Sequence, residues 1–474
     1  MTYQSILHCE THILRNQITK CGKMYGLQIT SDDLSVQIKG EAKLHDEFLS
    51  MFDHNDDVVI FLDNQHPNAV RDQFKTYCKF CPEIMNDRNV ILERLSPRPL
   101  PPIGQYGRTA SWYAKYYNFP TTDATPIIAI ISLGGSYQTS DLVTYWKTIC
   151  GLNNYPNVIN VPVGQSSIPK YTGAGPDIEN TLDLEIVGAV CPKSTLLFIS
   201  APNSFSGFYS AFATAINGVT IAGKKYQPSI LSISWGAPEI IWTTPNLNAF
   251  NNLFGQAVAK GITIFVASGD NGSSDNYMTN KLPNVDFPSS SPNVIAVGGT
   301  TVTSINETVW SYNSVHKWGA GSGCSALFPM PSWQNGIAIF PTNTTPSVNF
   351  LSGKRVVPDI ALSSDPLNGY IIYMGGKINK VGGTSCAAPL AAGLFGLMNF
   401  KYTTNLASHL YKIFTNPTQR NISYNDIILG SNDNLSAFTG VWNAGVGFDF
   451  CSGLGSVDGT NLFNVLKQLG LKSS

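Results

Sequence analysis

Short apolar runs, each bounded by Gly, Pro or Ser, alternate with segments of helical spacing in the chain beyond about residue 105. Ser140–Trp146 and Leu247–Ala259 are two of the helical segments. Short β-rich runs separated by helices predict an α/β fold, with a doubly wound, mostly parallel sheet covered on both faces. Functional residues of such sheets gather beyond the carboxyl ends of the strands. The apolar runs are Ile127–Ile131, Leu196–Ile199, Ile230–Ile233, Ile262–Val266 and Val294–Val297.

The first part of the chain has a different pattern and more charge. Strand-like pieces such as Val58–Leu62 and Val90–Leu92 mix with polar, helix-compatible segments, which predicts a small α+β unit over residues 1–95. Residues 1–100 hold 25 of the 61 charged residues, although they are only about a fifth of the chain. This change in charge is the clearest boundary in the composition.

A Pro-rich stretch, Arg94–Pro102, follows this unit. Such a stretch is extended in character and packs poorly, so residues 96–105 are expected to be a linker. Residues 106–474 are then a large domain.

The composition argues against several kinds of partner. The formal net charge of the 474 residues is −1, which gives no reason to expect nucleic acid or an anionic membrane. No apolar run reaches the roughly 18–20 residues that a membrane helix needs, so no membrane span is expected. The start, Met1–Ser5, has neither a basic segment nor a long apolar one, and no secretory signal is expected.

The nine cysteines are scattered along the chain. Cys78 and Cys81 have the spacing of a redox or zinc half-site, but no second pair or His cluster accompanies them, so metal or redox use is not expected. The redox state of the compartment stays open. Asn-x-Ser/Thr sequons, which are weak evidence for secretion in a chain rich in these residues, occur at Asn271, Asn306, Asn343, Asn421 and Asn434.

A Gly-rich turn before an apolar, small-residue run contains the first candidate for chemistry. Gly383–Pro389 leads into Leu390–Met398, which predicts a buried helix with Ser385 at its start. Free backbone N–H groups and the helix dipole favour negative charge at that place. Ser385 is therefore a candidate nucleophile whose acyl oxyanion is held nearby. The alternative is that Ser385 only caps the helix.

A serine nucleophile needs a proton acceptor, and the histidines do not supply one in a recognisable motif. Only His316 and His409 lie in the large domain, and neither belongs to an Asp/His/Ser pattern of the subtilisin type. Carboxylates are the other choice. Glu179 and Asp183 lie four residues apart on a segment of helical spacing, so they share one face, and two buried acids there would share a proton. The alternative is a solvated acidic face.

The apolar run Ile262–Val266 continues into Ala267-Ser268-Gly269 and then Asp270. A carboxylic acid kept protonated near Ser385 could donate a hydrogen bond to an oxyanion, as in the ketosteroid isomerase that illustrates this use of a buried acid. The alternative is an ordinary turn residue among Gly and Asn.

Taken together, these motifs resemble those of the sedolisins, the serine-carboxyl peptidases. The resemblance runs from about Tyr106 to Gly459. It implies a subtilisin-like fold, and it implies roles for Ser234, Trp235 and Gly236 in binding substrate. The matching segments are Ile128–Gly135 as first strand, Glu179–Asp183 as acid pair, Ser232–Gly236 as cleft strand, Ala267–Asp270 as oxyanion aspartate and Gly383–Pro389 as nucleophile.

The resemblance also implies the catalytic roles and one Ca²⁺ ion. Glu179 would be the base, Asp183 would orient it, Asp270 would stabilise the oxyanion and Ser385 would attack. Carboxylates and backbone carbonyls are hard oxygen ligands that suit Ca²⁺; the alternative is an Asx turn followed by a Gly-rich loop. Some family members have Glu in the first strand where Ser132 stands here. The calcium ligands that the resemblance implies are Asp426, Ile427, Gly445, Gly447 and Asp449.

We therefore predict an acid-acting serine-carboxyl peptidase, made as a zymogen, that acts as a monomer on protein or peptide substrates. Residues 1 to about 100 would be its inhibitory propeptide, although this unit is shorter than in the family. The resemblance suggests an acidic, secreted or lysosome-like compartment. Two alternatives stay open: a catalytically silent binding protein with the same fold, and a His-dependent peptidase. Endopeptidase and tripeptidyl-peptidase action are not distinguished.

Overall fold

The structure is a computed structural model. It describes the backbone of five strands within the first hundred residues, and residues 107–473 apart from six gaps. The chain divides into two compact units, Met1–Ser96 and Pro97–Ser474. The gaps are at 174, 276–282, 304–305, 312–317, 338–352 and 435–440.

The described part of the first unit is one antiparallel sheet with strand order β2-β3-β1-β4-β5. The predicted strand Val58–Leu62 is β4. The other predicted strand, Val90–Leu92, lies outside the described residues, as do the Pro-rich stretch and both residues of the Cys78–Cys81 pair. The remaining strands are β1 (Thr2–Cys9), β2 (Gln28–Ser31), β3 (Ser35–Glu41) and β5 (Phe74–Thr76).

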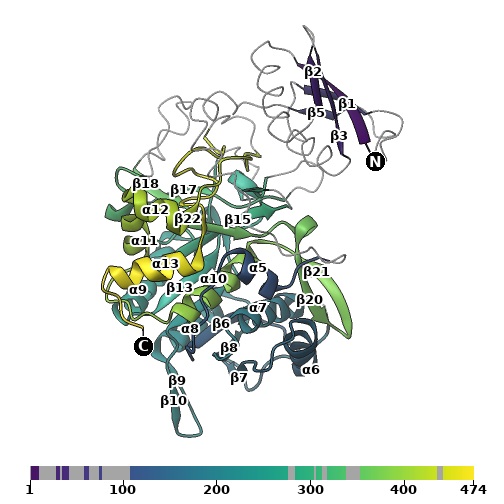
Figure 1. The fold of residues 1–474 in the computed structure, drawn as a ribbon. Helices are drawn as coiled ribbons and strands as arrows, with labels where there is room; N and C mark the ends of the chain where they lie inside the picture. Colours follow the sequence, from purple (N-terminus) through teal and green to yellow (C-terminus); the bar gives the residue numbers. More distant parts are fainter. Residues whose placement is uncertain are drawn as a thin grey trace. The chain divides into compact units, whose positions relative to one another are not determined.

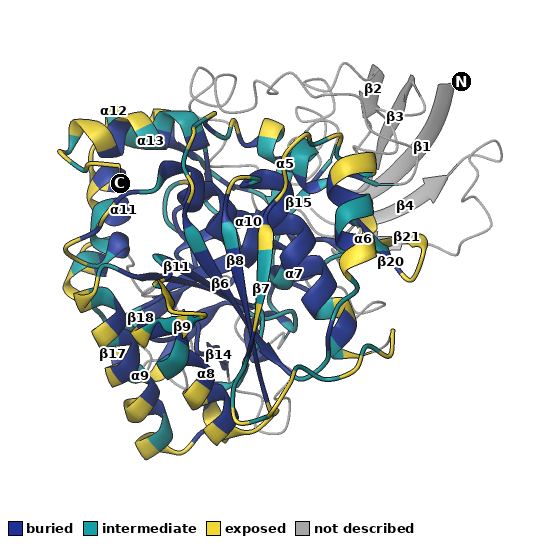
Figure 2. Cartoon of the chain, turned by 90° about the horizontal axis from the view of Figure 1, so that it is seen from below, coloured by how far each residue is buried: buried dark blue, intermediate teal, exposed yellow. Residues whose placement is uncertain are grey.

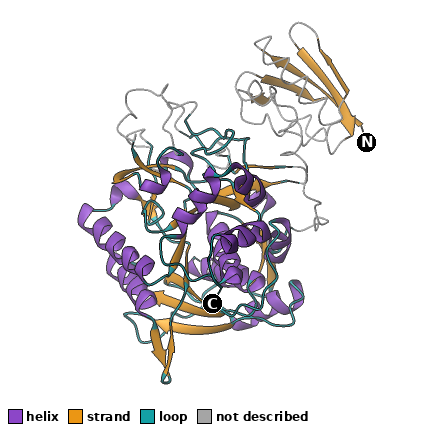
Figure 3. Ribbon diagram, turned by 60° about the vertical axis from the view of Figure 1, so that its left-hand side comes forward, coloured by secondary structure: helices purple, strands orange, loops and turns teal. Residues whose placement is uncertain are grey.

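A mostly parallel sheet forms the centre of the large unit, as the alternation of apolar runs and helical segments predicted (Figures 1 and 3). Its strand order is β16-β15-β13-β11-β6-β8-β7, and β19 also pairs with β15. Only the β15–β16 pair is antiparallel within this sheet. All five predicted runs are strands of it. The strands are β6 (Ile127–Leu133), β7 (Asn157–Pro162), β8 (Thr195–Ala201), β11 (Ile230–Ile233), β13 (Thr263–Ala267), β15 (Ile295–Val302), β16 (Glu307–Val309) and β19 (Ile360–Ser363).

Helices cover both faces of this sheet, and the side chains of β6 show why. Because successive residues of a strand point to opposite faces, Ile128 and Ile130 pack in one apolar core and Ala129 and Ile131 in another. The first core contains α7 and α10, and the second contains α8 and α9. The bounds of these helices are α7 (Pro176–Val190), α8 (Phe205–Asn217), α9 (Thr244–Ala259) and α10 (Thr384–Met398).

The α10 helix runs through the interior of the unit. Every residue of α10 except Ser385 is buried (Figure 2). Its small residues permit close packing: a Cβ at Gly393 would lie 2.1 Å from Val190 of α7, and one at Gly396 would lie 2.9 Å from Ile128 of β6. The helix is thus fixed tightly, with one polar side chain left accessible at its amino-terminal end.

Smaller elements surround this core. The predicted helical segment Ser140–Trp146 is α6 followed by a π-helical turn over Thr144–Ile149. The remaining helices are α5 (Ala110–Tyr116), α6 (Thr139–Val143), α11 (Leu406–Thr415), α12 (Pro417–Ser423) and α13 (Gly459–Gln468). The remaining strands are β9 (Val219–Ile221), β10 (Lys224–Tyr226), β12 (Ala237–Pro238), β14 (Asp286–Phe287), β17 (Gly323–Pro329), β18 (Lys354–Val357), β20 (Tyr370–Met374), β21 (Lys377–Val381), β22 (Tyr424–Asn425) and β23 (Ser456–Val457).

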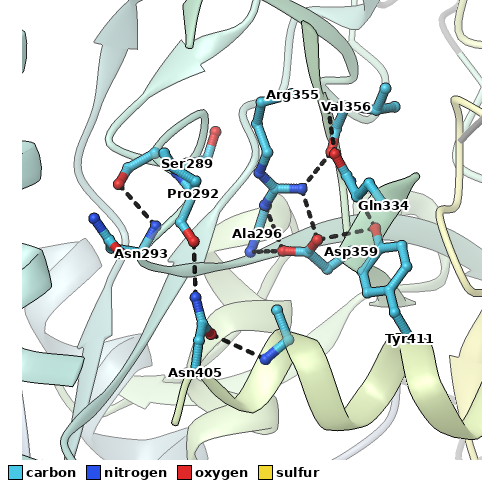
Figure 4. A network of polar contacts seen from close by, with 12 residues as sticks. Ser289, Pro292, Asn293, Ala296, Gln334, Arg355, Val356, Asp359, Asn405 and Tyr411 are labelled. Carbon is cyan, nitrogen blue, oxygen red and sulfur yellow. Dashed lines mark hydrogen bonds and ion pairs between the residues drawn. The ribbon is translucent and has the colours of Figure 1, made fainter. Parts of the chain in front are cut away.

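A buried ion pair links β18 to the central sheet (Figure 4). Arg355 donates two hydrogen bonds to Asp359, at 2.7 and 2.6 Å, and both side chains are fully buried. Asp359 also accepts from the N–H of Ala296 in β15 and from the Tyr411 hydroxyl of α11. Removing one partner of such a pair costs about 3–5 kcal/mol, so this network is structural and not a candidate site.

Among the described helices, none combines the length and the apolar character that crossing a membrane requires. The five cysteines between residues 107 and 473 are free thiols, and burial raises the pKa of Cys191 to about 12.

Candidate active site

The nucleophile turn begins at Gly383, whose φ of 108° is open to glycine and rarely to other residues. The N-cap residue of α10 is Gly383, with no side-chain capping bond, and the helix begins at Thr384. Ser385 is the second helical residue. The alternative that Ser385 merely caps the helix is therefore wrong, and its hydroxyl is left for other partners.

Glu179 and Asp183 project from α7 toward this turn. Only 1% of Asp183 is exposed, and Glu179 is half-buried with its Oε1 enclosed. Burial raises the pKa of Glu179 to about 7; hydrogen bonding to the Ser385 side chain lowers it, and the charge of Asp270 raises it. Burial and then the charge of Glu179 raise the pKa of Asp183 well above its usual range. The alternative of a solvated acidic face is wrong.

Asp270 follows β13 and reaches the first residue of α10. Its Oδ1 accepts from the N–H of Thr384 at 2.7 Å and from the Thr384 hydroxyl at 2.8 Å. Its Oδ2 lies beside the backbone of Gly383, since a Cβ there would be 2.7 Å away. Burial raises the pKa of Asp270, although both Thr384 bonds lower it. Because Oδ1 already accepts two hydrogen bonds, Oδ2 is the oxygen suited to carry a proton.

The three acids and the serine, which are spread over about two hundred residues of sequence, thus meet at one end of α10. Their sources are the α7 helix, the loop after β13 and the first turn of α10. This is the carboxyl edge of the parallel strands, where the alternation of strands and helices predicted a site.

The predicted substrate strand follows β11. The Ser234 hydroxyl lies 2.7 Å from Asp183 Oδ1 and 3.3 Å from the Ser385 carbonyl oxygen, so it belongs to the carboxyl network. Trp235 is half-buried, and its Nε1 is buried without a hydrogen-bond partner. Gly236 is exposed. The role of these three residues in binding substrate stays a prediction.

Ser132, at the place of the first-strand Glu of some sedolisins, lies at the end of β6. It is fully buried and its hydroxyl lies 2.5 Å from Asn180 Oδ1, next to Glu179 on α7. A neutral hydrogen bond between Ser132 and Asn180 therefore stands where a carboxyl group would be in those sedolisins.

A cavity of about 400 Å³ lies between α7 and the β20–β21 hairpin. It borders Ile178, the neighbour of Glu179, and Val381, which precedes the Gly382–Gly383 turn. Its other lining residues are Tyr171, Gly173, Ile372, Met374, Gly375, Asn379 and Lys380.

Comparison with known proteins identifies the family of the chain. A family model described as the subtilase family matches residues 170–425, which is more than half of the chain. The chain belongs to the subtilase family. Kumamolisin of Bacillus sp. (strain MN-32) is 37% identical over 74% of this subtilase and 62% of the relative. Sedolisin of Pseudomonas sp. (strain 101) is 29% identical, over 76% of this chain and 63% of the relative.

Solved structures give the same result. Pseudomonas sedolisin, a serine-carboxyl proteinase solved in complex with two molecules of pseudo-iodotyrostatin, aligns with a TM-score of 0.62 and 26% identity. The alignment covers 77% of this subtilase and 99% of that chain. The expected resemblance to the sedolisins and the subtilisin-like fold are confirmed. This subtilase spans only 62% and 63% of the length of the two curated relatives.

Three residues of the site escaped the sequence reasoning. Thr384 donates two hydrogen bonds to Asp270, but from its position before Ser385 it was interpreted only as part of the turn. Asp275 and Asp286 are buried acids near Asp270. The sequence pattern around Asp275 and Asp286 does not predict a role for them, because that role depends on which distant backbone segments they contact.

The residues of the predicted calcium loop are brought together. Asp426 Oδ2 accepts from the N–H of Gly447 at 2.8 Å, and Asp449 Oδ2 accepts from the N–H of Gly445 at 3.2 Å. Burial raises the pKa of Asp449 to about 7. Ile427 is fully buried beside Asp426. Two carboxylates beside a Gly-rich segment, with Asp426 Oδ1 buried, are hard oxygen donors of the kind that fits Ca²⁺. Within the described part of the subtilase, no group of three or more His, Cys, Asp or Glu forms a metal cluster.

Proposed function

We propose that this protein is a serine-carboxyl peptidase that cleaves peptide bonds in acid through an acyl-enzyme on Ser385. The observation that carries the proposal is the convergence of Glu179, Asp183 and Asp270 on the first turn of α10, where Ser385 is the one residue not buried. The named peptidases among the relatives support it.

Glu179 is the base of the proposed reaction. Burial raises the pKa of both acids and the charge of Glu179 also raises that of Asp183, so the pair shares one proton, and we assign the carboxylate that remains to Glu179. Ser385 then gives its hydroxyl proton to Glu179 as Oγ attacks the scissile carbonyl carbon. Asp183 keeps its proton and orients Glu179 through the shared polar contacts.

Asp270 stabilises the oxyanion. With a proton on Oδ2 it donates to the oxygen that becomes negative, while Thr384 fixes Oδ1. The backbone N–H of Ser385, which belongs to the first turn and has no intrahelical acceptor, is the second donor. Glu179 then returns the proton to the leaving amine as the C–N bond breaks. A water molecule, deprotonated by Glu179, releases the acid product and restores Ser385.

Two further parts of the proposal concern the whole chain. A Ca²⁺ ion bound by Asp426, Asp449 and the carbonyls of Ile427, Gly445 and Gly447 would neutralise two carboxylates and stabilise the loop that follows β22. Residues 1 to about 100 would act as an inhibitory propeptide, removed near the Pro-rich stretch.

The histidine alternative has weaker support. His409 lies on α11, where its Nε2 is 3.0 Å from the Thr404 hydroxyl and burial lowers its pKa. No contact between His409 and the acid network is present. His316 lies outside the described residues.

The test is peptide hydrolysis by the full chain after incubation at about pH 4, near the ordinary pKa of carboxyl groups. Ser385→Ala is expected to lower kcat by several orders of magnitude. His409→Ala is the matched control and should leave kcat unchanged. Sizing the chain before and after incubation tests whether Ser385→Ala also blocks self-cleavage. A rise in Tm with pseudo-iodotyrostatin in a chain that hydrolyses no peptide would indicate a silent binding protein. Activity that survives Ser385→Ala would overturn the proposal.

A further inference from the structure

A second pair of acids, Asp275 and Asp286, lies outside the set that the proposed mechanism uses. Only 2% of Asp275 and 8% of Asp286 is exposed. Asp275 Oδ2 and Asp286 Oδ1 are buried and have no hydrogen-bond partner. Because an ionised carboxylate is costly to bury without partners, the protonation of these two acids has consequences for the fold around them.

Each acid lies against one of two backbone segments beside the nucleophile turn, at Gly236 and at Gly269, which we call the two walls of the cleft. A Cβ at Gly236, in the predicted substrate strand, would be 1.9 Å from Asp286 Oδ1. A Cβ at Gly269, the residue before Asp270, would be 3.1 Å from Asp275 Oδ1. Asp286 begins β14, which pairs with β12 directly after Gly236. The pair therefore contacts both backbone segments that flank the nucleophile.

In the part of the chain that the structure describes, the titratable groups that act on the pair are acidic. Asp270 faces both acids from the loop after β13, and the two acids face each other. Asp433 Oδ1 lies 3.4 Å from the hydroxyl of Ser273, which stands two residues before Asp275. Glu239, after β12, turns aside to accept from Ser325. Among the residues the structure describes, no lysine, arginine or histidine pairs with Asp275 or Asp286.

The surroundings of the pair favour the neutral acids. Burial and then the charge of Asp270 raise the pKa of Asp275 to about 7, against a lowering contact with the Asn271 side chain. Burial and then the charges of Asp275 and Asp270 raise the pKa of Asp286 well above its usual range, although the N–H of Ala237 lowers it.

We propose that Asp275 and Asp286 are positioning residues that hold the two walls of the cleft together only while they carry protons. In acid, two neutral carboxyl groups fill the space under Gly236 and Gly269 without net charge. As the pH rises and the pair ionises, negative charge builds up between the two segments without a cation to balance it, which pushes β12 and the Gly269 loop apart. The meaning for catalysis rests on the proposed function, whereas the effect on stability does not.

The direction of the pH effect follows from proton binding. In the unfolded chain both acids ionise at about pH 4. In the folded chain they keep their protons longer, Asp275 to about 7. The folded state therefore binds more protons than the unfolded state between these values. Their favourable contribution is complete below about pH 4 and is lost as the pH rises through about 7.

The experiment measures Tm by circular dichroism on the full chain carrying Ser385→Ala, which prevents self-digestion. Asp275→Asn and Asp286→Asn replace each acid by a neutral group of the same shape. At about pH 4 the variants should stay within about 1 °C of the parent, and at about pH 7.5 each should raise Tm by about 2 °C or more. The double variant should gain less than the sum, since either change removes the repulsion.

Asp123→Asn is the control. Asp123 is an acid on the surface whose pKa is lowered by hydrogen bonding to Lys193 and by its charge, so its removal should not raise Tm at neutral pH. An equal shift at both pH values would mean a purely steric role and would overturn the inference, as would a lower Tm of both variants at about pH 7.5. If these Tm shifts occur and the chain with Ser385 cleaves no peptide, the proposed function fails and this inference stands.

Discussion

The Ser234 hydroxyl lies 3.3 Å from the carbonyl oxygen of Ser385. In an α-helix this carbonyl would accept from the N–H four residues later, but residue 389 is a proline and has no N–H. The same hydroxyl lies 2.7 Å from Asp183 Oδ1. The proline of the Ser-x-x-x-Pro motif therefore leaves an acceptor through which the cleft strand ties the nucleophile turn to the acid pair.

Ser234→Ala is expected to move the acidic limb of the pH–rate profile to higher pH. The Ser234 side chain lowers the pKa of both Glu179 and Asp183, so its loss raises them, and Glu179 must be ionised to accept a proton. A hydrogen bond to a charged group is worth about 1.5–3 kcal/mol, which corresponds to a shift of about one pH unit or more. The measurement is kcat/KM against pH with a peptide substrate.

Ser232→Ala is the matched control for this change. Ser232 lies on β11 two residues earlier, and its buried hydroxyl has no hydrogen-bond partner. Its removal should leave the profile in place. A Ser234→Ala profile that keeps its acidic limb would contradict the link between this hydroxyl and the base.

Gly383→Ala is expected to lower kcat by about 10²–10³-fold, the usual effect of losing one oxyanion donor. The new Cβ would lie 2.7 Å from Asp270 Oδ2, which must move from the place where it faces the oxyanion. The backbone cost of a side chain at φ 108° adds to this effect.

Gly376→Ala separates the two causes. Gly376 has a φ of 74°, also in the region that favours glycine, but a Cβ there would meet nothing within 4 Å. The measurement is kcat together with Tm for both variants. Equal losses of kcat would show that backbone strain, rather than displacement of Asp270, explains the result.

Local pattern was enough to predict the architecture of the large unit. Runs such as Ile230–Ile233 are strands because β-branched and apolar residues between turn signals fit a buried parallel sheet. The boundaries were less certain, since β15 continues to Val302 beyond the predicted end at Val297. Polar residues such as Thr300 sit in that extension and accept burial because tertiary contacts satisfy them.

The candidate site divides in the same way. Glu179 and Asp183 were predicted from their spacing, because four residues on a helix fix a shared face before any tertiary structure exists. The partner of Ser234 could not be predicted, since it depends on how β11 approaches α7. Asp275 and Asp286 could not be predicted either, because their role comes from two distant glycines, Gly236 and Gly269.

Asp270→Asn is expected to remove the alkaline limb of the pH–rate profile while keeping part of the activity. The amide oxygen can accept from Thr384 as Oδ1 does, and the NH₂ group then takes the place of protonated Oδ2. The pKa of Asp270 is raised, so its carboxyl group keeps the donor proton in acid and loses it as the pH rises. An amide does not titrate and keeps its N–H donors. Asp270→Ala is the comparison and should lose about 10²–10³-fold in kcat at every pH. Two variants with equal activity would contradict the donor role.

Calcium is expected to raise the Tm of the full chain, because binding to the folded state alone stabilises it. At a free concentration of a hundred times Kd the gain is about 2.7 kcal/mol, and chelation should remove it. Mg²⁺ should substitute poorly, since backbone carbonyls and two carboxylates suit the larger, flexible coordination shell of Ca²⁺. The measurement is Tm with Ca²⁺, with Mg²⁺ and with a chelator, in chains carrying Ser385→Ala.

Asp449→Asn should abolish the rise in Tm that Ca²⁺ causes, because it removes one of the two carboxylate ligands. Its carboxylate accepts from the N–H groups of Gly445, Cys451 and Ser452, so an amide would also weaken the loop without metal. The decisive quantity is therefore the difference in Tm with and without Ca²⁺, rather than Tm itself. Asp433→Asn, an acid outside the predicted ligand set, should keep the full difference. A difference that survives Asp449→Asn would assign the ion to another place in the chain.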